Sequence, residues 1–161
     1  MSQISIEFAT PNDVPEIFNM IKGLAEFEKL SHEVTGSVDE LQQSLFGDKP
    51  ECEVIIAKSQ GKAMGFALFF HNYSTFLTRK GIYLEDLFVY PEHRGKGIGL
   101  TLLKKLAKIA KQRNCARLDW SVLDWNEKAI NFYESLGAKP MTGWLTYRLT
   151  GEKLQQLAEL P

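Results

Sequence analysis

The sequence predicts an α/β protein in which a mixed, mostly antiparallel central sheet carries helices on both faces. Three observations lead to this class. Two stretches, 10–13 and 37–40, have the signature of a helix start, a capping side chain followed three positions later by an acid. Two apolar runs within 52–71 flank a short polar turn, as in a hairpin. The chain from 81 onward alternates strand patterns with helix patterns.

The first third of the chain is expected to form one strand and two helices. Residues 3–9 alternate between polar and apolar side chains, which is typical of a strand. Thr10 then caps a helix that has proline at its first position and runs to about Phe27. A second, shorter helix should begin after Ser37 and end near Gly47.

The middle of the chain is expected to supply three strands. Residues 52–58 and 63–71 are rich in β-branched and aromatic side chains, and they join through the turn at 59–62. A loop at 72–80 should lead to a third strand at 81–90.

The last part of the chain should return to alternating helices and strands. An amphipathic helix at 97–113 is followed by a strand at 115–122 and a helix at 126–136. A last strand is expected at 143–149, and Thr150 is placed to cap a terminal helix.

Composition narrows the classes of protein and partner. A chain of 161 residues is expected to be one domain, 1–161, and 44% hydrophobic residues are enough to form a core. The net charge of −1 gives no basic field for nucleic acid, and no apolar run is long enough to cross a membrane. The N-terminus does not resemble a secretory leader. We therefore expect a cytoplasmic protein without nucleic-acid or membrane partners. The two cysteines and three histidines are scattered, so no metal site is expected.

The glycine-rich stretch Arg94–Gly99 (RGKGIG) stands directly before the amphipathic helix. It is not a Walker A loop, because Gly97 stands where Ser or Thr is required. It is not a dinucleotide fingerprint either, because Leu100 takes the place of the last small residue. Free amides at a helix N-terminus, close-approaching glycines and the charges of Arg94 and Lys96 together suit a pyrophosphate. The alternative is a plain loop in which glycine supplies only turn geometry.

The stretch YLEDLFVYPEHRGKGIG (83–99) resembles the acetyl-CoA-binding motif of the GNAT superfamily of N-acetyltransferases. Further similarities at 24–30, 73–76, 122–138 and 143–144 follow the order found in the spermidine/spermine, or diamine, N-acetyltransferase group. This group includes thialysine N-epsilon-acetyltransferases, and YSTF and VLDWN favour that branch. The resemblance covers nearly the whole chain and implies the GNAT fold.

The resemblance implies acetyl-CoA as cofactor and a set of residues that bind it. The backbone of Leu87, Phe88 and Val89 is expected to pair with the pantetheine arm. The pyrophosphate is expected to bind at Arg94, Gly95, Lys96, Gly97, Ile98 and Gly99. Asn126 matches a residue that hydrogen-bonds the cofactor arm, although it could equally serve only as a helix cap.

Acetyl transfer to an amine needs a base, because only about 0.1% of a primary ammonium is neutral at pH 7. Glu85 is the candidate base, acting directly or through water. Alternation along the strand places Glu85 and Asp86 on opposite faces, and burial of Glu85 would raise its pKa. The alternative is an edge or ion-paired acid without function.

Tyr133 is the candidate acid toward the departing CoA thiolate. On spacing alone, a tyrosine beside the apolar stripe of its helix is typical of a core residue with a solvated hydroxyl. The resemblance, however, places the family's proton-donating tyrosine at this position.

The acceptor amine is the least defined partner. The resemblance gives Phe27, Glu28, Glu85 and Asp86 as residues that line its groove. Ser74 and Thr142 stand where true polyamine acetylators carry acids, which reduces the negative charge. We therefore expect direct transfer, in a ternary complex, to a diamine, a polyamine or a thialysine-like or lysine-like amino acid. The alternatives are a non-catalytic CoA-binding regulatory module and a protein-lysine acetyltransferase. Members of the group are usually homodimers, so a homodimer is expected.

Overall fold

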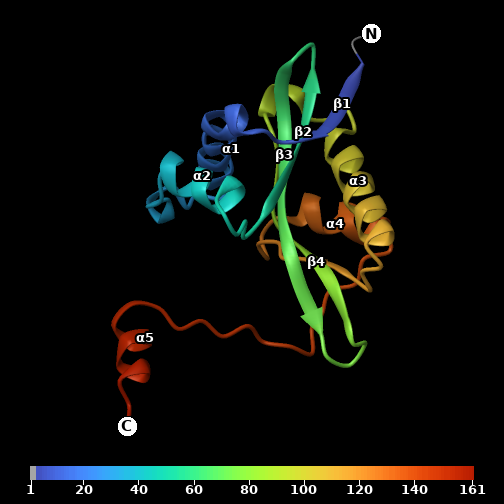
Figure 1. Ribbon diagram of the computed structural model, residues 1–161. Coiled ribbons are helices and arrows are strands. Elements are labelled where there is room, and N and C mark those ends of the chain that lie inside the picture. The colour runs from blue at the N-terminus through green and yellow to red at the C-terminus, as the bar shows by residue number, and fades with distance from the viewer. Residues whose placement is uncertain (1–2) are drawn as a thin grey trace. The chain divides into compact units, whose positions relative to one another are not determined.

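The computed structural model describes residues 3–161. The chain forms two compact units, one that ends at Leu123 and a second that consists of Asp124–Pro161. The first unit contains the sheet (Figure 1). Its elements are β1 (Ile4–Phe8), α1 (Val14–Phe27), α2 (Val38–Phe46), β2 (Glu53–Ser59), β3 (Lys62–Ser74), β4 (Arg79–Val89), α3 (Ile98–Gln112) and β5 (Leu118–Trp120). The second unit contains α4 (Glu127–Ser135) and α5 (Gly151–Ala158).

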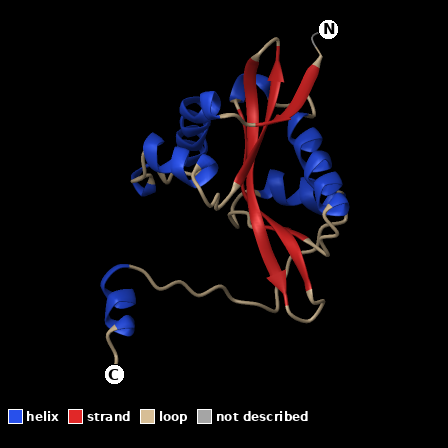
Figure 2. Cartoon of the chain, in the orientation of Figure 1, coloured by secondary structure: helices blue, strands red, loops and turns tan. Residues whose placement is uncertain are grey.

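The sheet has the order β1-β2-β3-β4-β5. Neighbouring strands are antiparallel except for β4 and β5, which run parallel. Helices α1 and α2 lie on one side of the sheet and α3 on the other (Figures 1 and 2). The predicted fold class, a mixed and mostly antiparallel sheet with helices on both faces, is therefore confirmed.

Apolar side chains from both layers form the core of the first unit. Ile17 and Met20 of α1 pack with Leu45 of α2 against Phe66 and Phe88 of the sheet, and all five are buried. On the opposite side, α3 buries the apolar residues Leu102, Leu106 and Ile109, which recur at helical spacing. Helices therefore pack against both β3 and β4 from the two sides of the sheet.

The two predicted helix starts are present and carry their caps. The Thr10 amide donates to Asp13 Oδ2 at 2.8 Å, and a short 3₁₀ turn leads into α1. The Glu40 amide donates to Ser37 Oγ at 3.1 Å, which caps α2. Each cap satisfies an amide that the first turn of a helix would otherwise leave unbonded.

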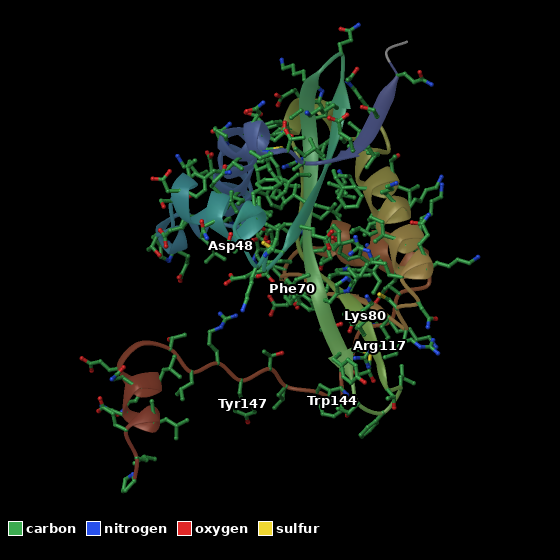
Figure 3. All side chains as sticks on the ribbon, in the orientation of Figure 1. Asp48, Phe70, Lys80, Arg117, Trp144 and Tyr147 are labelled. Carbon is green, nitrogen blue, oxygen red and sulfur yellow. The ribbon has the colours of Figure 1, made fainter. Side chains whose placement is uncertain are left out.

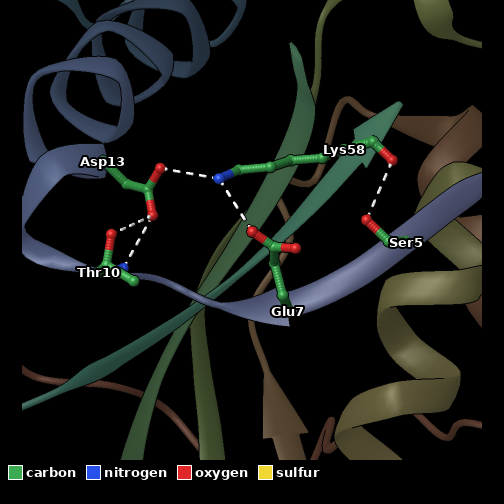
Figure 4. A network of polar contacts seen from close by, with 5 residues as sticks. All are labelled: Ser5, Glu7, Thr10, Asp13 and Lys58. Carbon is green, nitrogen blue, oxygen red and sulfur yellow. Dashed lines mark hydrogen bonds and ion pairs between the residues drawn. The ribbon is translucent and has the colours of Figure 1, made fainter. Parts of the chain in front are cut away.

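A network of charges joins the start of α1 to the first two strands (Figure 4). Lys58 Nζ lies 3.0 Å from Glu7 Oε1 and 3.0 Å from Asp13 Oδ1. Burial alone would raise the pKa of Asp13, but hydrogen bonds from Thr10 and Lys58 and the Lys58 charge together lower it. The ionised carboxylate of Asp13 therefore stabilises the fold above its unfolded pKa, and this contribution is lost as the pH falls through the lowered value.

Replacing Lys58 by methionine should lower the free energy of unfolding at pH 7 by about 1–3 kcal/mol, because Asp13 loses its charged donor while remaining largely buried. Urea denaturation measures the change. Lys62→Met is the matched control, since Lys62 is exposed at the start of β3 and should tolerate the change. Equal stability of the two variants would contradict a role for the network.

The structure differs from the prediction in the lengths of β3, β4 and β5. The loop expected at 72–80 is a tight turn at 75–78, because β3 continues to Ser74 and β4 already begins at Arg79. The strand expected at 115–122 is reduced to β5, of which only three residues pair with β4. Pairing with each other lengthens β3 and β4, whereas pairing between β4 and β5 stops after three residues. The side-chain pattern of one strand does not show where its pairing with a neighbour begins or ends.

The last strand predicted, 143–149, is not formed. The segment before α5 is drawn as loop in Figure 2, and Figure 3 shows Trp144 and Tyr147 along it. These side chains are 77% and 89% exposed. The pattern of alternating side chains is present, but a strand also needs a paired neighbour for its backbone groups.

Candidate functional site

The edge of β4 that pairs with β5 has no neighbouring strand directly before the glycine-rich stretch. Parallel pairing with β5 stops at Leu84 and Trp120, after which nothing pairs with this edge of β4 among residues 3–161. The Tyr90 amide donates to Met64 O on β3. Because backbone groups alternate in direction along a strand, those of Leu87 and Val89 point toward the free edge. An extended ligand with amide groups can pair there as an additional strand would.

Phe88, predicted with Leu87 and Val89 to pair with the cofactor arm, lies differently from them. Its backbone faces β3, where it pairs with Phe66, and its side chain is buried in the core. Leu87 and Val89 thus turn their backbone groups to the free edge, where the Val89 carbonyl already accepts from Arg94 Nε, while Phe88 holds the strand in place.

The glycine-rich stretch forms the turn into α3. Gly95 and Gly97 have φ values of +78° and +79°, which side-chain-bearing residues rarely adopt. Gly97 is the N-cap of α3, and no side chain caps this helix. The first amides of a 15-residue helix, together with its dipole, can therefore bind an anion. Apart from adjacent residues and the helix's own backbone, no atom lies within 4 Å of a Cβ placed on Gly97 or Gly99, so a phosphate could approach the backbone closely.

Arg94 links this turn to β4 and α1. Its Nε donates to Val89 O at 2.8 Å, and its guanidinium lies over the rings of Phe27 and Phe88, at 4.8 and 5.4 Å from their centroids. Phe27, one of the predicted acceptor-lining residues, is thus brought beside the predicted cofactor loop. The neighbouring Lys96 is exposed.

A β-bulge on β4 determines where the predicted carboxylates point. Phe69 pairs with Leu84, but Leu68 pairs with Asp86, so Glu85 is an extra residue without a partner on β3. Such a bulge reverses the alternation of side chains along the strand.

The bulge brings Glu85 and Asp86 to the same face of the sheet. Asp86 pairs with Leu68, which packs in the core under α1 and α2. Tyr83 pairs with Phe70, two residues from Leu68 on that same face, and Glu85 follows Tyr83 by two positions. The prediction that Glu85 and Asp86 lie on opposite faces is therefore wrong, because it assumed strict alternation.

The burial considered for Glu85 is not found either. Glu85, whose burial was expected to raise its pKa, is exposed, while Asp86 is half-buried. Burial, and then the charges of Glu85 and Glu28, together raise the pKa of Asp86 to about 7. Glu28 follows the end of α1, and burial raises its pKa as well. The structure therefore gathers three predicted acceptor residues, Glu28, Glu85 and Asp86, into one acidic group that suits a cationic amine.

The remaining two predicted residues belong to the second unit. Asn126 is the N-cap of α4, where its Oδ1 accepts from the Ala129 amide at 3.3 Å, so the capping alternative is confirmed. Tyr133 lies on α4, its ring 5.6 Å from that of Phe132 between centroids.

Among residues 3–161, no group of histidine, cysteine and acidic side chains is arranged to hold a metal ion. No helix of this described part is long and apolar enough to span a membrane.

Sequence reasoning missed a cluster at the far end of α3. Arg113, directly after α3, makes a bidentate ion pair with Glu53 on β2 at 2.7 and 2.9 Å. Arg113 Nη1 also lies 3.0 Å from His71 Nε2. No signal in the sequence connects these positions, which are far apart along the chain.

Comparison with known proteins shows the family of this chain. The model of the acetyltransferase (GNAT) family matches residues 18–138. A thialysine N-epsilon-acetyltransferase of Mus musculus is 41% identical over 98% of this chain and 99% of its own length. A human spermidine/spermine N(1)-acetyltransferase-like protein 1 is 34% identical over 98% of this chain and 24% of its own length. Among solved structures, an integron cassette protein of V. cholerae superposes with a TM-score of 0.82 and 32% identity, covering 99% of both chains.

Proposed function

The chain belongs to the acetyltransferase (GNAT) family, and from this premise we propose that it transfers an acetyl group from acetyl-CoA to a primary amine of a small molecule. One observation carries the proposal. The edge of β4 becomes free just before the uncapped N-terminus of α3, so one continuous surface offers strand-like pairing and an anion site. The family match crosses the boundary between the two units, which supports treating 1–161 as one acetyltransferase domain.

The residues at this edge fit the cofactor. Leu87 and Val89 would pair with the pantetheine arm, and the turn from Arg94 to Gly99 would hold the pyrophosphate. When bound, acetyl-CoA supplies the activated acetyl thioester. Asn126 is proposed to bind the arm in addition to capping α4.

The acidic group would bind and deprotonate the acceptor. Glu28 and Asp86 would attract the ammonium ion, and Glu85, being exposed, would take its proton through a water molecule. The neutral amine would take the acetyl group directly: a C–N bond would form, the C–S bond would break, and the second proton of the amine would replace the one that Tyr133 gives to the sulfur. Tyr133 would return a proton to the sulfur, since a phenol of pKa near 10 is protonated at pH 7.

The relatives point to thialysine and to spermidine or spermine as acceptor chemistries. Thiol release from acetyl-CoA, measured with a panel of diamines, polyamines, thialysine and lysine, tests the proposal. Turnover with any of these amines supports it. Acetylation only of lysines in folded proteins would favour a protein acetyltransferase, and CoA binding without any turnover would favour a regulatory module.

We extend the proposal to a cytoplasmic homodimer without nucleic-acid or membrane partners. The supporting observation is a set of large apolar side chains exposed along the segment before α5, namely Met141, Trp144, Leu145 and Tyr147. Exposed apolar groups in such number are typical of surfaces that bind another protein. Sedimentation equilibrium tests the dimer, and a monomer at micromolar concentration would exclude it.

A further inference from the structure

The chain is nearly neutral overall, at −1, but its charges are separated along the sequence. Residues 93–118 contain eight lysines and arginines and no acid, whereas residues 26–53 contain eight acids and two lysines. The basic segment comprises the glycine-rich turn, α3 and the start of β5. The acidic segment comprises the end of α1, the whole of α2 and the loop into β2.

The fold places the two segments on opposite sides of the sheet. Helices α1 and α2 lie on one side and α3 on the other (Figure 1). The acidic group of Glu28, Glu85 and Asp86 lies on the side of α1 and α2, whereas the anion site is at the N-terminus of α3. The second unit, Asp124–Pro161, contains five acids and four cations and adds little net charge. Each site is therefore surrounded by charge opposite in sign to the ligand proposed for it.

Three lysines of α3 point away from the core. Lys104, Lys108 and Lys111 are spaced three or four residues apart and so share one stripe of the helix. This lysine stripe is exposed and lies on the opposite side of the helix from the apolar stripe that packs on the sheet. Within residues 3–161, no acid lies within ion-pairing distance of these three lysines. Their charges are therefore not neutralised locally and act on the surrounding solvent.

The lysine stripe is too far along the helix to touch a pyrophosphate at its N-terminus. An α-helix rises 1.5 Å per residue, which places Lys104 about 10 Å and Lys111 about 21 Å along the axis from Gly97. The field of a charge extends over about 8 Å at physiological ionic strength and about 30 Å at 0.01 M. The stripe can therefore act on an anion that approaches the turn, most strongly at low salt.

We propose that Lys104, Lys108 and Lys111 form a steering surface that guides the polyanionic cofactor to the turn at the start of α3. The proposal rests on the proposed function, because the phosphates of the cofactor supply the negative charge. Its pyrophosphate and its phosphate monoester together carry about four negative charges at pH 7. A field of this kind raises the rate of productive encounter more than it holds the bound ligand. The acids of residues 26–53 repel the same anion, so the other side of the sheet is left to the cationic acceptor.

Stopped-flow association of coenzyme A, labelled with a fluorophore on its sulfur, tests the steering surface without any acetylation. In a variant with Lys104, Lys108 and Lys111 all replaced by glutamine, the association rate constant should fall about fivefold to tenfold at an ionic strength of about 0.01 M. At about 1 M the difference should vanish, because the field is then screened within about 3 Å. The dissociation rate constant should not change, since these lysines do not contact the bound cofactor.

The matched control removes the same amount of charge elsewhere. It replaces three exposed lysines outside α3 by glutamine, namely Lys22, Lys49 and Lys62. Its association rate constant should stay within about twofold of that of the unaltered protein. Equal slowing of association in both triple variants would assign the effect to net charge and would overturn the proposal.

The charge of the ligand gives an independent measurement. Labelled 3′-dephospho-coenzyme A lacks the phosphate monoester and therefore about two of the negative charges. The ratio of association rate constants between the unaltered protein and the lysine variant should be smaller for this ligand. The same ratio for both ligands would contradict steering by charge.

The remaining outcomes separate this proposal from the proposed function. Unchanged association in the lysine variant at low salt, with coenzyme A still bound, would overturn the steering surface and leave the proposed function intact. Faster dissociation with unchanged association would make the lysines contacts of the bound cofactor and would also overturn it. If the unaltered protein binds no coenzyme A at any salt concentration, the proposed function fails and the steering surface fails with it.

Discussion

Replacing Tyr133 by phenylalanine should lower kcat about 100-fold, because the departing thiolate would lose its proton donor. Binding of CoA should remain nearly unchanged, since only one hydroxyl is removed. Stopped-flow thiol release gives kcat, and calorimetry gives the affinity for CoA.

Tyr147→Phe is the matched control for this experiment. It makes the same chemical change in the same unit, at a tyrosine that is 89% exposed, and should leave kcat unchanged. An unaltered kcat in Tyr133→Phe would exclude Tyr133 from the reaction and return it to the alternative of a structural tyrosine.

Replacing Asp86 by asparagine should stabilise the protein at pH 8 by about 2–4 kcal/mol relative to the unaltered chain. Burial and the neighbouring Glu85 and Glu28 raise the pKa of Asp86 to about 7, from 3.8 for an unperturbed aspartate. A group with a raised pKa stabilises the fold fully below its unfolded value and loses this contribution as the pH rises through its folded value. Asparagine resembles the protonated form and cannot ionise.

The gain should therefore be small at pH 4 and grow until about pH 8. Urea denaturation at several pH values measures it, and Asp48→Asn, at an exposed site, should give a pH profile parallel to that of the unaltered chain. A parallel profile for Asp86→Asn as well would mean that Asp86 is not held in a desolvated acidic group. The same variant should bind amines more weakly at pH 8, because it lacks one of the three carboxylates.

The bulge at Glu85 shows where reading the sequence fails at the site. All residues of the acidic group were identified, but Glu85 was treated as buried, and the faces of Glu85 and Asp86 were taken from strict alternation. No glycine or proline in YLEDLFV marks the irregularity. It arises from the register between β3 and β4, which only the packing of both strands determines.

The two strands predicted near the end of the chain also show what a local pattern cannot predict. The segments at 115–122 and 143–149 both have strand-like patterns, yet the first pairs over three residues and the second not at all. The end of the pairing between β4 and β5 matters most for function, because it leaves free the edge of β4 at which we propose that the cofactor binds. Whether a segment pairs depends on what lies beside it, and a local pattern carries no such information.

By itself, the sequence determined the elements whose signals are local. The caps at Thr10 and Ser37, the hairpin of β2 and β3, the glycines before α3 and the family motif depend on neighbouring residues alone. Tertiary structure decided the features that depend on residues far apart, namely the bulge that joins Glu85 with Asp86 and the ion pair between Glu53 and Arg113. The physical reason is that burial, charge coupling and strand pairing are properties of groups brought together in space, whereas caps and turns are properties of adjacent positions in the chain.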